Sequence, residues 1–247
     1  MAASDFNDLT DAYEAMVDWP KRLSREAPFF NRWFERIGAA TVLDVACGTG
    51  HHAAMFHASG LRVEAADISP AMIERAHSTF GNRPDLCWIV RSFEEPPPQK
   101  FDAIICIGNS LALCADLETV RRSITTMMSA ARDGGIVVIQ VLNLRRFPDG
   151  PCVWQKHIRT TIHEHEVLIV KGIHRCGQRG FVDVIVSPID DPKLTRSESI
   201  PLLSLELEQL QVMLQQAGAT SIQAYGDYED RPFAADVSGD LILVAQK

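Results

Sequence analysis

The stretch VLDVACGTG, residues 42–50, carries the first chemical signature of the chain. An apolar run ends in a carboxylate at Asp44, and a turn with glycines at positions 48 and 50 follows. Glycine has no side chain, so a ligand can approach the backbone of such a turn closely. Backbone N–H groups at the start of a following helix then point toward that ligand. The stretch therefore predicts a strand, a turn and a helix arranged around a ligand.

A second carboxylate stands where a nucleotide-like ligand would need one. LRVEAAD, residues 61–67, is predicted to be the next strand and ends in Asp67. An acid about 20 residues after the glycine turn accepts hydrogen bonds from ribose hydroxyls. The spacing alone also fits a dinucleotide site, because Ala53 occupies a position where that pattern allows alanine. Asp44 favours S-adenosylmethionine, because a carboxylate repels a diphosphate but attracts a sulfonium and an ammonium group.

Short apolar runs alternate with helix-like segments from about residue 41 to residue 142. Strands are predicted over 41–45, 61–67, 86–91, 101–108 and 135–142, and helices over 51–60, 69–80 and 116–133. Ser69 before Pro70, and also Asp116, are residue types that cap helix N-termini. The apolar runs are continuous, which is typical of strands buried on both faces. We therefore expect an α/β fold, with a mostly parallel sheet and helices on both faces.

The pattern changes after about residue 143, where β-like segments follow one another with turns and no helix between them. These segments cover 158–165, 166–175 and 181–189. A helix over 204–217 and strands over 221–226 and 241–246 are predicted to complete the chain. The predicted organisation is one domain over 41–247 with an antiparallel insertion at 143–203. Residues 1–40 are predicted to form a helical lid in front of it.

Composition limits the classes of function. The net charge of −8 does not favour a nucleic-acid-binding surface, and no run of 18 apolar residues suggests a membrane span. The N-terminus lacks the basic and then apolar pattern of a signal peptide. The six cysteines form no C-x-x-C pair. We expect a cytoplasmic protein with a small-molecule substrate and no nucleic-acid or membrane partner. Its oligomeric state stays open.

Several motifs together carry a family resemblance. VLDVACGTG followed by VEAADISPAMIERA at 63–76 resembles the class I S-adenosylmethionine-dependent methyltransferases. The segments FDAIICIGNSLALC, DGGIVVI and YGDYEDRPF, at 101–114, 133–139 and 225–233, resemble the glycine N-methyltransferase group. The resemblance is scattered over roughly residues 10–246 and is strongest at 41–76 and 101–139. It implies a Rossmann-like fold with an antiparallel strand insertion, and S-adenosylmethionine as the cofactor.

The resemblance also implies roles for individual residues. The cofactor would contact Asp44, Ala46, Gly48 and Gly50 at the turn, Asp67 at the ribose, Ile68, Met72, Ser92 and Phe93 at the adenine, and Ile107 at the methionine part. In the N-terminal segment, Tyr13 and Trp19 would cover the cofactor. Arg22 would bind its carboxylate through two parallel hydrogen bonds, although Arg25 competes for this role. Phe93 is also compatible with a plain core position.

Asn109 is the candidate catalytic residue, because it follows a predicted strand at the sheet edge where α/β folds bind ligands. Its amide oxygen could orient an N–H acceptor, although asparagine also serves as a turn former. Leu142 stands where the glycine-specific enzymes have an arginine for the substrate carboxylate. Arg145 and Arg146 lie nearby but out of register. These residues imply an acceptor that is larger or less anionic than glycine.

The predicted function is methylation of a small molecule, with an amine nitrogen as the acceptor. Methylation of oxygen or carbon in a small metabolite is the alternative within the same superfamily. A cofactor-binding protein without turnover is the alternative from another class. His163 and His165 have a spacing that could suit a metal, but no third ligand accompanies them, so no metal site is predicted.

Overall fold

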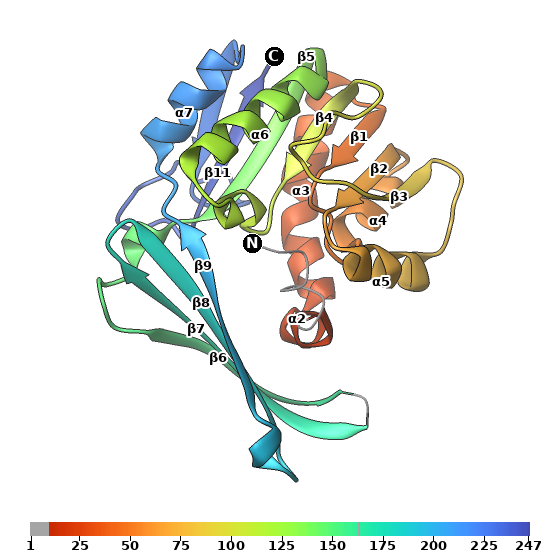
Figure 1. Cartoon of the computed structure of the whole chain (residues 1–247). Helices are drawn as coiled ribbons and strands as arrows, with labels where there is room; N and C mark the ends of the chain where they lie inside the picture. The colour runs from red at the N-terminus through yellow and green to blue at the C-terminus, as the bar shows by residue number, and fades with distance from the viewer. Residues whose placement is uncertain (1–9, 163) are drawn as a thin grey trace.

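The computed structural model describes residues 10–162 and 164–247 of the chain, which form two β-sheets with helices around the larger one (Figure 1). Two helices begin the described part, α2 (Thr10–Met16) and α3 (Trp19–Ile37). The sequence pattern placed residues 1–9 in the lid, but they lie outside the described residues. None of the described helices has the length and apolar character needed to cross a membrane.

The larger sheet has seven strands in the order β10-β11-β5-β4-β1-β2-β3. Their bounds are β1 Thr41–Asp44, β2 Arg62–Asp67, β3 Leu86–Val90, β4 Phe101–Cys106, β5 Ala131–Leu142, β10 Ser221–Tyr225 and β11 Asp240–Gln246. The strands β1 to β5 run parallel to one another, and β11 and β10 pair antiparallel at one end. This arrangement confirms the predicted mostly parallel sheet.

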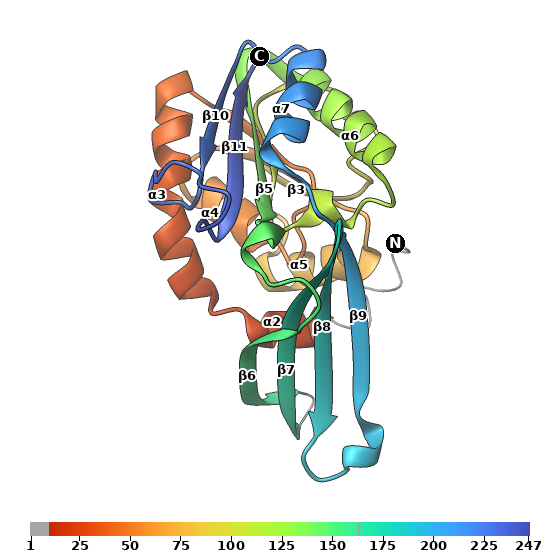
Figure 2. The ribbon, with the colours of Figure 1, turned by 90° about the vertical axis from the view of Figure 1, so that its left-hand side faces the viewer.

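Helices cover both faces of this sheet (Figure 2). The remaining helices are α4 His51–Ala58, α5 Pro70–Phe80, α6 Leu117–Ala130 and α7 Leu207–Gln216. One buried cluster joins α3 and α4 to one face through Phe30, Phe56 and Ile105, and another joins α6 and α7 to the opposite face through Ile124 and Leu210. Apolar surface is therefore removed from water on both sides of the strands, as their continuous apolar runs predicted.

The helix starts follow the predicted caps. Ser69 Oγ accepts the Met72 N–H at 3.3 Å, and Asp116 Oδ1 accepts the Thr119 N–H at 2.8 Å. The end of α6 differs from the prediction, because the helix stops at Ala130 and β5 begins at Ala131. Gly134, at a φ of 78°, donates its N–H to the Lys247 carbonyl at 3.1 Å and so belongs to the sheet edge.

The smaller sheet is fully antiparallel and confirms that the fold includes the predicted antiparallel strand insertion. Its strands are β6 Val153–Ile162, β7 His165–Cys176, β8 Arg179–Pro188 and β9 Arg196–Leu203. Only three β-like segments were apparent in the sequence, because RSESIPLL in β9 is polar and contains a proline. The sheet extends away from the larger one, beside α2 (Figure 1). Ala12 and Met16 of α2 pack in one apolar cluster with Val167, Ile169 and Val184.

The strand order places a crevice at the carboxyl ends of β1 and β4. From β1 the chain proceeds to β2 and β3 on one side, whereas β4 and β5 lie on the other side. The connections after β1 and β4 therefore leave the sheet in opposite directions, which opens a space between them. Leu111, in the 3₁₀ turn η1 (Ser110–Leu113) after β4, also packs in the same cluster as Leu202 of β9.

Candidate active site

A cavity of about 300 Å³ lies at the carboxyl ends of the parallel strands. All of the residues predicted to bind the cofactor line it except Gly50: Tyr13, Trp19, Arg22, Asp44, Ala46, Gly48, Asp67, Ile68, Met72, Ser92, Phe93 and Ile107. The volume is at the lower end of the range for small-molecule sites. Segments that are far apart in the sequence thus meet around one space.

Gly50 stands behind the cavity and has a packing role. Its φ is +88°, and a Cβ added there would lie 2.7 Å from the ring of Trp88 and 2.8 Å from the Cβ of Ala76. Gly48 has a similar conformation, with a φ of +54°, but an added Cβ would meet no atom within 4 Å. Gly48 therefore lines the cavity, whereas the missing side chain of Gly50 allows the turn to pack closely against α5 and β3.

Two carboxylates, Asp44 buried and Asp67 partly buried, line the cavity from neighbouring strand ends. Asp44 is 1% exposed, and its Oδ1 accepts the Ala46 N–H at 3.4 Å. Burial raises the pKa of Asp44 to about 7, and the charge of Asp67 adds to the rise. Asp67 accepts the Gly48 N–H at 2.8 Å and the Ser69 N–H at 2.9 Å, although burial still raises its pKa. A ligand that brings positive charge would relieve the cost of holding both carboxylates here.

Arg22 is positioned by its neighbours on α3 and α4. Its Nε donates to Glu26 Oε1 at 3.0 Å, and its guanidinium lies 5.3 Å from the centroid of the Trp19 ring. Glu26 is 1% exposed and also pairs with His52 Nε2 at 2.8 Å. Burial alone would raise the pKa of Glu26, but the His52 hydrogen bond and the Arg22 charge hold it below its ordinary value. Arg25 is 59% exposed in its side chain and does not line the cavity, which favours Arg22 as the predicted anion-binding residue.

Aromatic contacts connect the N-terminal helices to the glycine turn. The Trp19 ring stacks on His51 with centroids 4.0 Å apart, and Tyr13 meets Trp19 edge-on at 5.9 Å. His51 Nε2 also lies 3.1 Å from Glu14 Oε2 on α2. The Trp19 Nε1–H is buried with no partner among the described residues. An unpaired buried donor at the cavity is the kind of group that a polar ligand satisfies.

The position of Asn109 in the structure differs from the predicted one. Asn109 does not line the cavity, and its Oδ1 accepts the backbone N–H of Leu142 at 2.5 Å. Its φ is +71°, which a short polar side chain tolerates better than most. The amide oxygen that we expected to orient an acceptor is thus bound to the end of β5. The competing interpretation from the sequence, a turn former after a strand, matches this geometry.

The two arginines near Leu142 also lie outside the cavity lining. Arg145 Nη1 is 3.9 Å from Glu206 Oε2, and the Arg146 guanidinium lies 5.4 Å from the Phe147 ring centroid. Arg22 is therefore the only Lys or Arg among the described residues that line this cavity. Of the two histidines whose spacing suggested a metal, His163 lies outside the described residues, and His165 lies 3.6 Å from Asp190 at an exposed position.

Some lining residues were missed from the sequence, although most adjoin the predicted ones. They are Val45, Cys47, His52, Glu94, Gly108, Ser110, Leu113, Cys114, Ala115 and Thr119. Those from 108 to 119 belong to the segment that continues FDAIICI past the end of β4. Nothing in the apolar pattern of SLALC indicated that the 3₁₀ turn would direct part of it toward the cavity.

Comparisons with known proteins agree with this architecture. A family model described as a methyltransferase domain matches residues 42–135. The glycine/sarcosine N-methyltransferase of Parasynechococcus marenigrum is 33% identical over 149 residues, which are 58% of this chain and 52% of that protein. The glycine N-methyltransferase of Rattus norvegicus is 32% identical over 156 residues, or 55% of this chain and 53% of that protein. The chain thus spans about half the length of the curated relatives it matches.

Solved structures match nearly the whole chain. An S-adenosylmethionine-bound amino pentose methyltransferase from Micromonospora echinaspora has a TM-score of 0.75 at 21% identity, covering 95% of this chain and 94% of that one. A sugar N-methyltransferase from a Streptoalloteichus species has a TM-score of 0.72 at 22% identity, covering 91% and 88%. The chain therefore contains a methyltransferase domain with the Rossmann-like fold of class I S-adenosylmethionine-dependent methyltransferases, and it resembles the glycine N-methyltransferase group.

Proposed function

We propose that the protein is an S-adenosylmethionine-dependent methyltransferase that methylates an amine nitrogen of a small molecule. The observation that carries this proposal is the charge pattern of the cavity, which is lined by Arg22 and by the carboxylates of Asp44 and Asp67. The methionyl tail of the cofactor carries a carboxylate, an ammonium and a sulfonium group. Arg22 is complementary to the carboxylate, and Asp44 and Asp67, two of the three acidic residues that line the cavity with Glu94, are complementary to the positive groups.

Each residue type suits a different part of the cofactor. Arg22 has guanidinium N–H groups beyond the one bound to Glu26, and they suit a carboxylate. Asp44 suits the ammonium group, and Asp67 suits the ribose hydroxyls. The side chain of Ile68 is 49% exposed to solvent. Together with Met72, it offers an apolar surface on which the adenine ring can pack. These assignments follow the family resemblance and are compatible with the geometry.

Methyl transfer depends on the alignment of the donor and the acceptor more than on a strong acid or base. The bound cofactor supplies a methyl group on a sulfonium, whose leaving group is neutral. The protein must hold the acceptor in line with that methyl group and exclude water. The aromatic residues Tyr13 and Trp19 cover the cavity from the N-terminal helices and serve the second requirement. Asn109 contributes by holding the end of β5 in place through Leu142.

The acceptor is proposed to be a small amine that is larger or less anionic than glycine. Leu142 carries no charge, Arg145 and Arg146 contact other groups, and none of the three lines the cavity. A carboxylate placed in this region without a cationic partner would lose several kcal/mol of hydration without compensation. The relatives named for glycine and sarcosine and the structures named for amino sugars both support nitrogen as the acceptor atom.

Calorimetry with S-adenosylmethionine and its demethylated product tests the cofactor assignment. Replacing Asp67→Ala removes two charge-assisted hydrogen bonds to the ribose, each contributing about 1.5–3 kcal/mol, so the affinity should fall about 100-fold or more. The exposed Asp190→Ala variant, which is away from the cavity, should bind like the wild type. Equal affinity in the wild type and Asp67→Ala, or preference for a nicotinamide dinucleotide, would contradict the assignment.

A screen of acceptors with labelled S-adenosylmethionine tests the reaction. Glycine, sarcosine, amino sugars and neutral amines should be compared with hydroxy compounds, and we expect transfer to an amine with glycine a poor acceptor. Label found on oxygen or carbon would replace the proposal by the alternative methylation. Tight cofactor binding with no transfer to any member of the panel would favour the binding protein without turnover. Efficient methylation of glycine would overturn the specificity argued from Leu142.

A further inference from the structure

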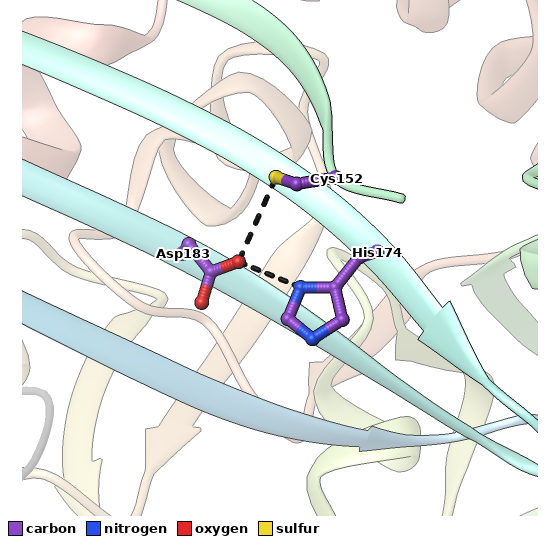
Figure 3. A group of neighbouring side chains, drawn as sticks. All are labelled: Cys152, His174 and Asp183. Carbon is purple, nitrogen blue, oxygen red and sulfur yellow. Dashed lines mark hydrogen bonds and ion pairs between the residues drawn. The ribbon is translucent and has the colours of Figure 1, made fainter. Parts of the chain in front are cut away.

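Three potential metal ligands meet on the smaller sheet (Figure 3). Cys152 precedes β6, His174 lies on β7 and Asp183 lies on β8. Asp183 Oδ2 is 2.7 Å from His174 Nδ1 and 3.7 Å from Cys152 Sγ. The three donor atoms all lie within 4.8 Å of one another, and each side chain is partly exposed. None of the three lines the cofactor cavity.

The register of the sheet explains why these residues meet. Gly172 of β7 pairs directly with Asp183 of β8, and His174 lies two residues from Gly172 on the same face. A Cβ added at Gly172 would stand 2.5 Å from Cys152 Sγ. The missing side chain of the glycine therefore leaves the space that the thiol occupies beside Asp183. This face is opposite to the one whose Ile169 and Val184 pack against α2.

Neighbouring groups orient two of the three ligands. Ser199 of β9 donates its Oγ–H to Asp183 Oδ1 at 2.7 Å, which leaves Oδ2 for the cluster. The His174 ring stacks on Phe181 with centroids 4.8 Å apart. A carboxylate and an imidazole with fixed orientations lose little freedom when a metal binds, and such outer contacts commonly support metal ligands.

We propose that Cys152, His174 and Asp183 bind one zinc ion, with water in the fourth position. Thiolate, imidazole and carboxylate are the ligands that zinc takes in proteins, at about 2.0–2.3 Å in a tetrahedral arrangement. Donor atoms in that arrangement lie about 3.4–3.6 Å apart. The 3.7 Å from Cys152 Sγ to Asp183 Oδ2 is close to this value, and the His174 and Asp183 atoms, at 2.7 Å, need to separate by a fraction of an ångström.

The proton balance of this binding is defined. A free cysteine thiol has a pKa of about 8.5 and therefore carries its proton at neutral pH. Zinc replaces that proton, which is released to solvent. His174 binds through Nδ1 as the neutral ring, with its N–H on Nε2. The ion would neutralise the thiolate and the carboxylate together and would tie the segment before β6 to β7 and β8.

Cobalt(II) absorption and zinc calorimetry on reduced, tag-free protein test the site. We expect one ion per chain, release of about one proton per ion, and a thiolate-to-cobalt charge-transfer band. Cys152→Ser should abolish that band, whereas Cys176→Ser should keep it, because Cys176 is an exposed free cysteine at the end of β7 and outside the cluster. Absence of the band in the wild type, or its persistence in Cys152→Ser, would overturn the proposal.

A further variant separates ligation from a general effect on folding. Ser199→Ala removes only the hydrogen bond that orients Asp183, so zinc affinity should fall about 10–100-fold while the charge-transfer band remains at saturating cobalt. Unchanged zinc affinity in Ser199→Ala would show that Asp183 does not ligate the ion, and would reject the three-residue site. Neither readout depends on methyl transfer, so the result is independent of the proposed function.

Discussion

Gly48 and Gly50 share a left-handed backbone conformation but differ in their surroundings, and this difference predicts opposite phenotypes. At Gly50, an alanine Cβ would meet Trp88 and Ala76 within 2.8 Å in addition to the backbone strain. Gly50→Ala should therefore lower the free energy of unfolding by about 2–4 kcal/mol. Gly48→Ala meets no neighbour, so we expect a loss of only about 1 kcal/mol, together with weaker cofactor binding.

Urea denaturation and calorimetry with S-adenosylmethionine distinguish the two glycines. Gly50→Ala should lose more stability than Gly48→Ala. Gly48→Ala should lose more cofactor affinity than Gly50→Ala, because only Gly48 of the two lines the cavity. If both variants lost the same stability, the packing role assigned to Gly50 would be wrong.

Ionisation of the Asp44 carboxyl group makes the cofactor-free protein less stable as the pH rises. Its pKa of about 7 in the folded protein is above the ordinary value of 3.8, so the folded state holds the proton more tightly. The stabilisation is complete below about pH 4 and is lost as the pH rises through 7, a cost on the order of 4 kcal/mol at pH 8. Asp44→Asn removes this cost and should unfold at higher urea concentration than the wild type at pH 8.

The difference between the two proteins should shrink by more than half at pH 5, where Asp44 is mostly protonated in the folded state. Urea midpoints measured at both pH values provide the check. A difference that does not change with pH would mean that the effect of Asp44→Asn does not come from titration of this carboxyl group.

Single residues also show where the sequence was sufficient and where it was not. The position of Asp44, Asp67 and Gly48 at the cavity could be predicted because it depends on strand ends and a turn that are local in the sequence. The part of Asn109 depends on the end of β5, whose Leu142 N–H it binds. That contact joins residues 33 positions apart, and no pattern within either segment specifies it.

At the scale of elements, α2 and α3 are predicted to act as a lid that orders when the cofactor binds. Tyr13, Trp19 and Arg22 line the cavity, and α2 rests on the smaller sheet through Met16. Cofactor contacts with these residues would stabilise the two helices against local opening. Tryptic cleavage at the exposed Lys21 should therefore slow at least several-fold at saturating S-adenosylmethionine.

A second exposed lysine provides a control cleavage site in the same digest. Lys193 is exposed in the 3₁₀ turn between β8 and β9 and does not line the cavity, so its cleavage rate should not respond to the cofactor. Cleavage at Lys21 that ignores the cofactor would argue against a lid. Equal slowing at both sites would indicate general stabilisation of the fold.

Lys171 on β7 is a lysine held in an unfavourable environment. It pairs in register with Lys156, whose Nζ donates to the Met16 carbonyl at 2.8 Å, whereas Lys171 has no hydrogen-bond or ion-pair partner in the described part of the chain. Burial lowers the pKa of Lys171, and the charges of Lys156 and Arg22 lower it further. The folded state thus disfavours the charged amine at neutral pH.

Lys171→Met should raise the melting temperature at pH 7, and the gain should diminish as the pH approaches 10, where the unfolded lysine also loses its charge. Calorimetric scans at the two pH values measure this, with the exposed Lys193→Met as the control. A lower melting temperature in Lys171→Met would show that the amine has a stabilising partner.

The elements were predictable where their apolar pattern is strong. The buried strands β1, β4 and β5 are recognisable from sequence, as are α5 and α6 from their caps. Strand β9 was missed because its residues are mostly exposed and its pairing with β8 provides the structure. The early end of α6 depends on the contact of Gly134 with the last residue of the chain.

At the scale of the molecule, the two sheets bring together residues whose association the sequence could not reveal. The pairing of β7 with β8 places Gly172 opposite Asp183, and the chain before β6 then adds Cys152. The cofactor cavity is different, because parallel strands deliver their carboxyl ends to a common edge whenever the fold forms. The fold class was therefore enough to locate the cavity, whereas the cluster of Cys152, His174 and Asp183 required the strand register.

The whole molecule contains ionisable groups with opposite pH dependence. Glu26 is held below its ordinary pKa despite its burial, by His52 and Arg22, so its stabilisation is present at neutral pH and lost in acid. Asp44 and Asp67 are shifted upward by burial and act in the reverse direction. Asp44 and Asp67 both line the cavity, where a cationic ligand can compensate for their burial.

Cofactor binding should consequently be coupled to the loss of a proton. Asp44 must be ionised to pair with the ammonium group, and it is largely protonated below its pKa of about 7. The affinity for S-adenosylmethionine should therefore fall as the pH decreases from 7.5 to 5.5, approaching tenfold for each pH unit at the lower end. The raised pKa of Asp67 acts in the same direction. Calorimetry over this range should show weaker binding and a flatter profile for Asp44→Asn, whereas a wild-type affinity that does not change with pH would remove Asp44 from the site.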